Sequence, residues 1–182
     1  MDFAPSVFLG GSDGVTAAVV ANALSVEPRS EFAQAVLDGR AFAFTMVTYD
    51  PDAHDTIIGV QNTHPTKNLN IHRIYITSDT ASQIQVFAAS GVTMAGTAIT
   101  GVNLNRGSGR LAQATAIADE TDNGEQALSY PTLLFRAVVA ANVQFEHETN
   151  GGIVLPYGIM MGVDLTTAAT GADGSIIGWY DA

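Results

Sequence analysis

The sequence predicts a mainly β protein, built as a single antiparallel β-sandwich with an extended N-terminal arm and one short helix. Apolar and polar residues alternate with a period of two over much of the chain beyond residue 40, which is the pattern of half-buried strands. Turn-forming residues divide this stretch at the spacing expected of an antiparallel sandwich. The chain has 182 residues, of which 47% are hydrophobic, and no internal repeat. This length suits one domain with a substantial core.

Residues 1–24 have the composition of an arm. Gly10, Gly11 and Gly14 give the backbone freedom, and the small residues that follow carry little bulk for a core. Ordering such a segment alone is costly, so we expect the arm to order on contact with a neighbouring subunit. The β-sandwich domain is then expected over residues 25–182.

A short helix is predicted near residues 30–38. Ser30 is suited to the N-cap and Gly39 to the position just past the C-terminus. Three residues are expected to share the apolar face of this helix: Phe32, Val36 and Leu37.

Strands are predicted after this helix from the period-two pattern. In the first of them, Phe42, Phe44 and Met46 fall on one face. In a later one the apolar phase changes between Ile71 and Ile74, which indicates either a bulge or burial on both faces. The expected strands are 41–48, 56–61, 69–77, 83–88, 97–104, 133–139, 143–149, 158–165 and 175–179.

The charge balance limits the partners. Eighteen acidic residues face seven basic ones, so the net charge is −11, which disfavours binding to nucleic acid and to anionic membranes. No apolar run reaches the roughly 18 residues of a membrane-spanning helix. The absence of cysteine from the sequence excludes disulfides and thiolate sites. Only 14% of the residues are charged, which favours a subunit of a larger assembly whose uncharged surface is covered by a partner.

Two acidic segments are candidate metal sites. Residues 119–125 place oxygen ligands at positions one, three and five of a calcium loop, but Tyr130 stands where a bidentate glutamate is required. Residues 50–55 carry three aspartates and His54 around a proline, which a surface turn explains equally well. We expect neither a metal site nor a cofactor site.

The sequence also lacks an enzyme signature. The four histidines show none of the HxH, HxxxH or HExxH spacings, and no GxSxG turn is present. Glu146 and Glu148 are expected on the strand face opposite His147, so these three side chains cannot bind one metal ion together. Residues 107–110 match neither a phosphate-binding loop nor a dinucleotide fingerprint. A glycosidase-type carboxylate pair stays open, because the fold sets the separation of such a pair.

Three segments carry a resemblance to a known class of proteins. Residues 64–75 (HPTKNLNIHRIY) run from a Pro-Thr turn into a strand, residues 101–108 contain the sequence NLN, and residues 152–158 (GIVLPYG) precede the last strand. Over residues 40–182 this layout resembles virion proteins of tailed bacteriophages. In these a strand of the form N-x-(S/P)-T-K-x-L-x-I-x-R-I-Y is followed by an NLN turn and a final strand pair after a Pro-Gly turn. In this chain Tyr157 separates the proline from the glycine.

The resemblance implies a jelly-roll-like module of the decoration or cement type on the capsid exterior. Such a protein binds the major capsid protein, commonly as a homotrimer, and contributes no catalytic residues. Arg29 and Arg40 flank the predicted helix beside the arm, which makes them candidates for pairing with shell carboxylates; solvated side chains without a partner are the alternative.

Two other hypotheses compete with this one. A carbohydrate-binding or host-adhesion module would use exposed aromatic rings, but most phenylalanines follow the strand period, and Trp179 lies close to the C-terminus. A hydrolase with scattered carboxylates is the third hypothesis.

Overall fold

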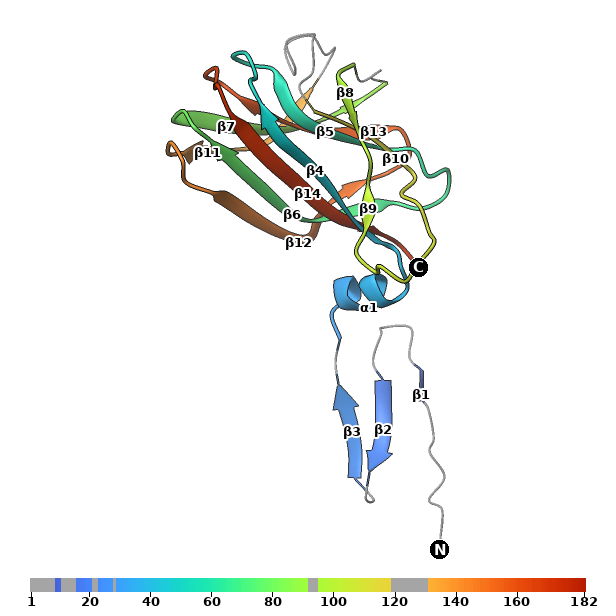
Figure 1. Ribbon diagram of the computed structural model, residues 1–182. Helices are drawn as coiled ribbons and strands as arrows, with labels where there is room; N and C mark the ends of the chain where they lie inside the picture. Colours follow the sequence, from blue (N-terminus) through green and yellow to red (C-terminus); the bar gives the residue numbers. More distant parts are fainter. Residues whose placement is uncertain (1–8, 11–15, 21–22, 28, 92–94, 119–130) are drawn as a thin grey trace, which may run out of the picture.

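The computed structural model describes residues 9–10, 16–20, 23–27, 29–91, 95–118 and 131–182. Two antiparallel sheets pack face to face, which confirms the predicted β-sandwich (Figure 1). The five-stranded sheet runs in the order β12 (Phe145–Leu155), β6 (Leu69–Ser78), β14 (Ala172–Tyr180), β4 (Ala41–Tyr49), β9 (Val102–Asn103). The six-stranded sheet runs in the order β11 (Thr132–Val139), β7 (Ser82–Ser90), β13 (Ile159–Leu165), β5 (Thr56–Asn62), β10 (Ala114–Ala118), β8 (Thr97–Ile99).

The strand order is that of a jelly roll. Setting β8, β9 and β10 aside, the first strand of the sandwich pairs with the last (β4 with β14), and the second with the one before the last (β5 with β13). The third and sixth pair in the same way (β6 with β12), as do the fourth and fifth (β7 with β11). This nested pairing is a long hairpin wound into two facing sheets. The three additional short strands come from the connection between β7 and β11, and they extend one edge of each sheet.

The inner faces of both sheets form one apolar core. Phe42, Phe44 and Met46 of β4 are buried on one face as predicted, and Ile84 and Val86 of β7 meet them from the other sheet. Each such side chain contributes about 1.5–3 kcal/mol through the removal of apolar surface from water. Because the chain has no disulfides, this burial is the main source of stability.

The change of phase in β6 comes from a bulge. On β14, Gly178 pairs with Ile71 and the adjacent Ile177 pairs with Arg73, so His72 is the extra residue on β6. The bulge lets Ile71 and Ile74 both face the core, and it confirms one of the two explanations predicted for this strand.

Helix α1 (Glu31–Leu37) forms where the sequence predicts it. The Ser30 hydroxyl accepts a hydrogen bond from the Ala33 amide at 3.1 Å, and Gly39 ends the helix with φ of +67°. The prediction of the apolar face is wrong for one residue: Leu37 is 54% exposed, and Ala35 is buried against the sandwich. On a helix of two turns the contacts with the sheet select the buried positions, and Ala35 permits a closer approach than a larger residue would.

Aromatic contacts dock α1 on the five-stranded sheet. The Phe32 ring stacks on the His72 ring, with centroids 3.9 Å apart, and meets Trp179 edge-on at 5.7 Å. Trp179 is buried in this cluster, together with Ala35 and Ala41. The bulge at His72 therefore points that ring outward, where it contacts the helix.

Two features of the connection between β7 and β11 depart from the sequence prediction. The single strand expected at 97–104 is divided into β8 and β9, which belong to different sheets. Between them the chain passes so close to the core that a Cβ on Gly101 would lie 2.6 Å from the Phe44 ring. Strand β10 was missed, because alanine-rich segments have low β-propensity and only pairing with β5 and β8 stabilises this strand.

Strand β12 continues beyond the predicted end at residue 149. Asn150 and Gly151 adopt φ of +50° and +81°, and pairing with β6 resumes at Ile153 after this irregularity. The turn-forming residues that indicated the end of the strand therefore form an irregularity within it.

The N-terminal segment contains three paired strands: β1 (Leu9–Gly10), β2 (Thr16–Val20) and β3 (Ala23–Glu27). They lie beyond α1, away from the two sheets (Figure 1). Strand β3 crosses the predicted boundary between the arm and the sandwich domain. Among the described helices none is long and apolar enough to cross a membrane.

Candidate functional site

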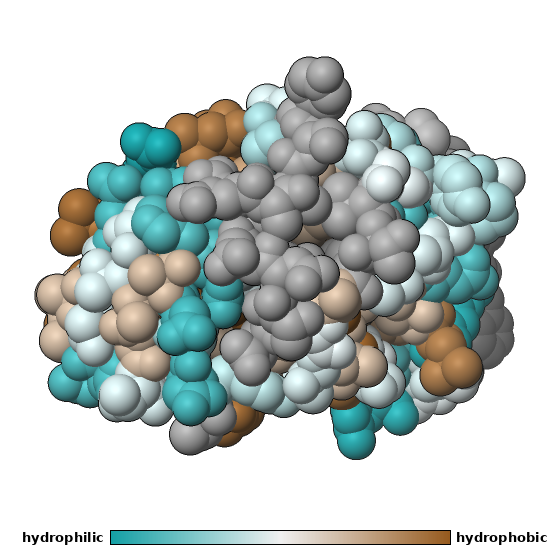
Figure 2. All heavy atoms as spheres, turned by 90° about the horizontal axis from the view of Figure 1, so that it is seen from above, coloured by the Kyte–Doolittle hydropathy of each residue, from teal (hydrophilic) through white to brown (hydrophobic). Residues whose placement is uncertain are grey.

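The two ends of the sandwich carry different charges. At the end opposite α1, which we call the loop end, backbone hydrogen bonds join four connections: His54 to Leu165, Ala169 to Pro51, Asp79 to Gly171 and Asn142 to Ser78. Five aspartates lie in these connections or at the start of the strand that follows: Asp50, Asp52, Asp55, Asp79 and Asp173. No lysine or arginine occurs in the four connections. Figure 2 looks down on this end and shows that hydrophilic, neutral and hydrophobic residues alternate over the described part of this face.

The opposite end, next to α1, which we call the helix end, gathers most of the basic residues. Five of the seven lysines and arginines belong to segments that meet there: Arg29, Arg40, Lys67, Arg106 and Arg110. Of the other two, Arg73 pairs with carboxylates on β12, and Arg136 lies exposed on β11. The helix end is therefore a local concentration of positive charge on a protein of net charge −11.

The structure separates the two arginines that the sequence analysis singled out. Arg29 is exposed just before α1. Arg40 is only 8% exposed, and its guanidinium donates hydrogen bonds to the Tyr180 carbonyl and, at 3.0 Å, to the Asp38 carboxylate. This contact, followed by one from Gln34, holds the pKa of Asp38 below its ordinary value. Arg29 thus remains an exposed cation for a partner, whereas Arg40 is used within the chain.

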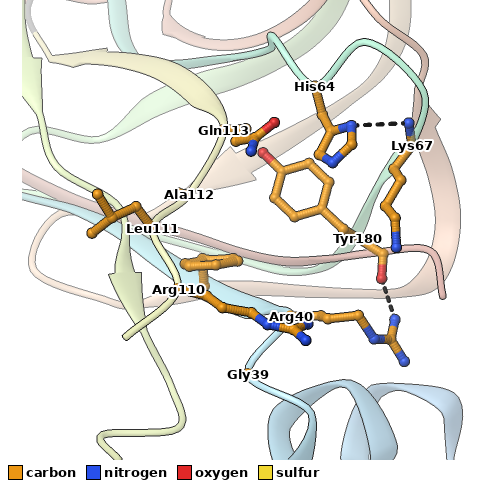
Figure 3. A pocket seen from close by; sticks show the side chains of 10 residues that line it. Gly39, Arg40, His64, Lys67, Arg110, Leu111, Ala112, Gln113 and Tyr180 are labelled. Atoms are coloured by element: carbon orange, nitrogen blue, oxygen red, sulfur yellow. Dashed lines mark hydrogen bonds between the residues drawn. The ribbon is translucent and has the colours of Figure 1, made fainter. Parts of the chain in front are cut away.

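A pocket of about 730 Å³ opens at the helix end (Figure 3). Four segments far apart in the sequence form it: the start of β4, the β5–β6 loop, the segment before β10 and the end of β14. Phe42 and Tyr180 meet edge-to-face at 5.8 Å in its wall, and the His64 ring lies 5.4 Å from Tyr180. The ten lining residues are Gly39, Arg40, Phe42, His64, Lys67, Arg110, Leu111, Ala112, Gln113 and Tyr180.

Two neutral hydrogen-bonding groups of this pocket have defined states. His64 Nδ1 accepts from the backbone amides of Thr66 and Lys67 at 3.3 and 3.2 Å, so the neutral ring carries its proton on Nε2. Burial raises the pKa of the Tyr180 hydroxyl, with a weaker opposing effect of the Gln113 backbone, so this group is an un-ionised phenol. Its oxygen has no hydrogen-bond partner of normal geometry among the described residues.

The other candidate residues do not form a second site within the described part of the chain. Residues 119–125 lie outside it. No group of three or more histidine or acidic side chains comes together there, residues 50–55 included. His147 packs against Phe135 at 4.4 Å, while Glu146 and Glu148 bind Arg73 on the opposite face, as the strand alternation predicts.

The fold and the site together define a class: a jelly-roll β-sandwich with an acidic loop end and a cationic helix end that contains a pocket. No protein-family model, curated protein or solved structure matches the chain. The fold is therefore established from the strand order, and function has to be argued from the site itself.

Sequence reasoning found only part of this site. Lys67 and His64 were noted in the segment of the resemblance, but not as pocket residues. Arg110 was passed over with the glycines around it, because that segment lacks a phosphate-binding pattern. The available signal was the scarcity of cations: with seven in the whole chain, the cluster of Arg106 and Arg110 was already unusual.

Proposed function

We propose that the protein is a structural virion protein, a decoration or cement subunit that binds the outside of a capsid and stabilises it by bridging subunits of the major capsid protein. The observation that supports this most is the charge polarity: five basic residues gather at the end from which the N-terminal segment leaves. The acidic loop end then points away from the shell. The resemblance over residues 40–182 supports the same role.

This polarity gives the subunit a preferred orientation toward an acidic surface. Charges separated by more than about 8 Å are largely screened at physiological salt, so the cationic end acts mainly once the partners are close. Arg29 and Arg106 are exposed there and are free to meet carboxylates. Contacts made together by the helix end and the N-terminal segment reinforce each other through effective concentration, by roughly 10² to 10⁴. Bridging of this kind slows the separation of shell subunits, which is kinetic stabilisation without a chemical step.

The proposed working unit is a homotrimer. Strand β11 is an edge of the six-stranded sheet with no outer partner among the described strands, and Val138 on it is 78% exposed. A neighbouring copy would cover this edge, and closed symmetry would satisfy every such edge. We expect a sedimentation mass three times the 19.0 kDa of the chain, and a monomeric mass for Val138→Glu. Val47→Glu, at a 67% exposed position on β4, is the matched control and should leave the trimer intact. A wild-type mass of 19.0 kDa would contradict the trimer in solution.

The proposed function is tested by heating particles that carry or lack the protein and recording genome release. We expect release at a higher temperature when the protein is bound. The double variant Arg29→Gln, Arg106→Gln should bind the shell more weakly and lose salt sensitivity, while Arg136→Gln on β11 should bind normally. Equal release temperatures with the protein demonstrably bound would rule out cementing, and failure of the protein to bind any shell would rule out the virion role.

A host-adhesion or carbohydrate-binding module is the second candidate function. One observation favours it: Tyr157, in the turn between β12 and β13, is 65% exposed and offers a ring for stacking on a sugar. Trp179, in contrast, is buried. Binding on a glycan array that Tyr157→Ala abolishes would support this function over shell binding.

A further inference from the structure

We propose that the pocket at the helix end is a binding site for an organic carboxylate carried on an apolar body. The pocket lies at the end proposed to face a shell, but it goes beyond that role because it would bind its ligand in the free protein. The inference rests on an excess of positive charge in the pocket, on the His64 donor beside it, and on the apolar part of its wall.

The positive charge in the pocket exceeds the negative charge that faces it. Arg40 and Arg110 both interact electrostatically with the carboxylate of Asp38, and only Arg40 is hydrogen-bonded to it. Lys67 Nζ donates to the backbone carbonyl of Asp181 at 3.1 Å, which is a neutral acceptor. The carboxylate of Asp181 is occupied by Asn68 and Asn70. Three cations thus face two carboxylates, Asp38 and Asp181, and none of the ten lining residues is acidic.

Arg110 is the cation that is free to bind a ligand. Its side chain is exposed, and no hydrogen bond or ion pair of its guanidinium occurs among the described residues. Like Arg40, it interacts electrostatically with the Asp38 carboxylate. A bound anion would give this guanidinium the direct partner that it lacks among the described residues. A guanidinium binds a carboxylate through two parallel hydrogen bonds, which makes this anion a good geometric match.

A neutral donor lies beside the cations. His64 lines the pocket, and its Nδ1 accepts from the backbone amides of Thr66 and Lys67, so the neutral ring carries its proton on Nε2. This nitrogen lies on the side of Tyr180 (Figure 3). It suits an acceptor such as a carboxylate oxygen. The Tyr180 hydroxyl does not take part, because its oxygen is shielded from solvent and lies against the Gln113 backbone.

The rest of the wall determines the body of the ligand. Phe42 and Ala112 line the pocket, and Leu111, 82% exposed, stands at its rim. The volume of about 730 Å³ lies within the range of pockets for small organic ligands. An apolar group beside the carboxylate would bury Leu111 and fill this volume. The same chemistry occurs in a free aryl or alkyl acid and at the C-terminus of a peptide that ends in an apolar residue.

The test is calorimetric titration of the full-length protein with 4-phenylbutyrate, with its uncharged amide, and with inorganic phosphate. We expect saturable binding of the acid and binding at least about tenfold weaker for the amide, since hydrogen bonds to a charged group are the stronger ones. A peptide ending in leucine with a free carboxylate, compared with its C-terminal amide, distinguishes the two sources. Tighter binding of the peptide acid supports a polypeptide end, and tighter binding of 4-phenylbutyrate supports a small molecule.

Two variants locate the site. Arg110→Gln should weaken binding of the acid by about threefold to tenfold or more. Arg106→Gln, which removes an exposed cation of the same end outside the pocket, should leave it unchanged. A melting temperature for each variant verifies that it is folded. The proposal is overturned if neither acid binds below about 10 mM, a dissociation constant that corresponds to negligible affinity. It is also overturned if the amides bind as well as the acids, if phosphate binds more tightly, or if Arg106→Gln and Arg110→Gln have equal effects.

Discussion

Gly162, in the middle of β13, is a position where a single methyl group should be strongly destabilising. A Cβ built on it would lie 2.4 Å from Cζ of Phe87 on the neighbouring strand, well inside van der Waals contact. Phe87 is fully buried in a small cluster with Ala89 and Met160, so the ring has little room to move. Gly162→Ala therefore overpacks this cluster.

The magnitude follows from two opposing effects. Overpacking of a buried site costs about 1–3 kcal/mol, and the loss of glycine flexibility in the unfolded chain returns about 0.4–1 kcal/mol. We expect the free energy of unfolding to fall by about 1–2 kcal/mol. For a chain of 182 residues this lowers Tm by roughly 2–8 °C. Gly109→Ala is the matched control: nothing lies within 4 Å of its Cβ, so only the favourable effect remains.

The assay is urea unfolding, with the midpoint compared at constant slope. A double-mutant cycle with Phe87→Leu isolates the clash, because the smaller side chain leaves room for the methyl group. In the F87L background, Gly162→Ala should cost close to nothing. The reasoning is refuted if Gly162→Ala is as well tolerated as Gly109→Ala, or if its cost is the same in both backgrounds.

Three further predictions concern α1 and its surroundings. Ser30→Ala removes the N-cap hydrogen bond and should lower the free energy of unfolding by about 0.5–2 kcal/mol. Ser30→Asp should keep the wild-type stability, and the urea midpoints of both variants test this; equal midpoints would contradict it. Burial, and then the charge of Arg73, lower the pKa of His72 from 6.5, while Glu148 opposes them. The unfolded chain therefore binds a proton more readily at this residue, so its contribution to stability is complete above pH 6.5 and declines as the pH falls below that value. His72→Gln should remove this part of the pH dependence; identical midpoint profiles from pH 5 to 8 would contradict it. Arg40→Met leaves a buried carbonyl without its donor and should cost about 1.5–3 kcal/mol by the same assay, with Arg29→Met as the harmless control.

The sequence predicted the architecture where local patterns decide it. The phase change between Ile71 and Ile74 indicated the bulge in β6, and Ser30 and Gly39 marked the ends of α1 correctly. Strand β10 was not predicted, because its alanine-rich sequence forms a strand only by pairing with strands distant in the sequence. Leu37 was placed wrongly because helical periodicity defines a face but not the depth to which a sheet buries it.

The pocket at the helix end could not be predicted in this way. Arg40 and the Tyr180 carbonyl are hydrogen-bonded across 140 residues of sequence, and Lys67 and Arg110 come from two further segments. Each segment reads as an ordinary loop or strand end by itself. Only the nested pairing of the strands brings them together, so the charge imbalance in the pocket is a property of the topology.

The central place of β14 also governs the order in which the protein can fold. This strand pairs with β4 on one side and with β6 on the other, although it is synthesised after both of them. At roughly 5–20 residues per second, the ribosome takes on the order of ten seconds to travel from β4 to β14. Throughout that interval both partner strands display an open edge and an uncovered apolar face, which is when a chaperone or an aggregate can capture them. A chain that stops short of residue 172 would therefore be split through the middle of its sheet rather than trimmed at an edge.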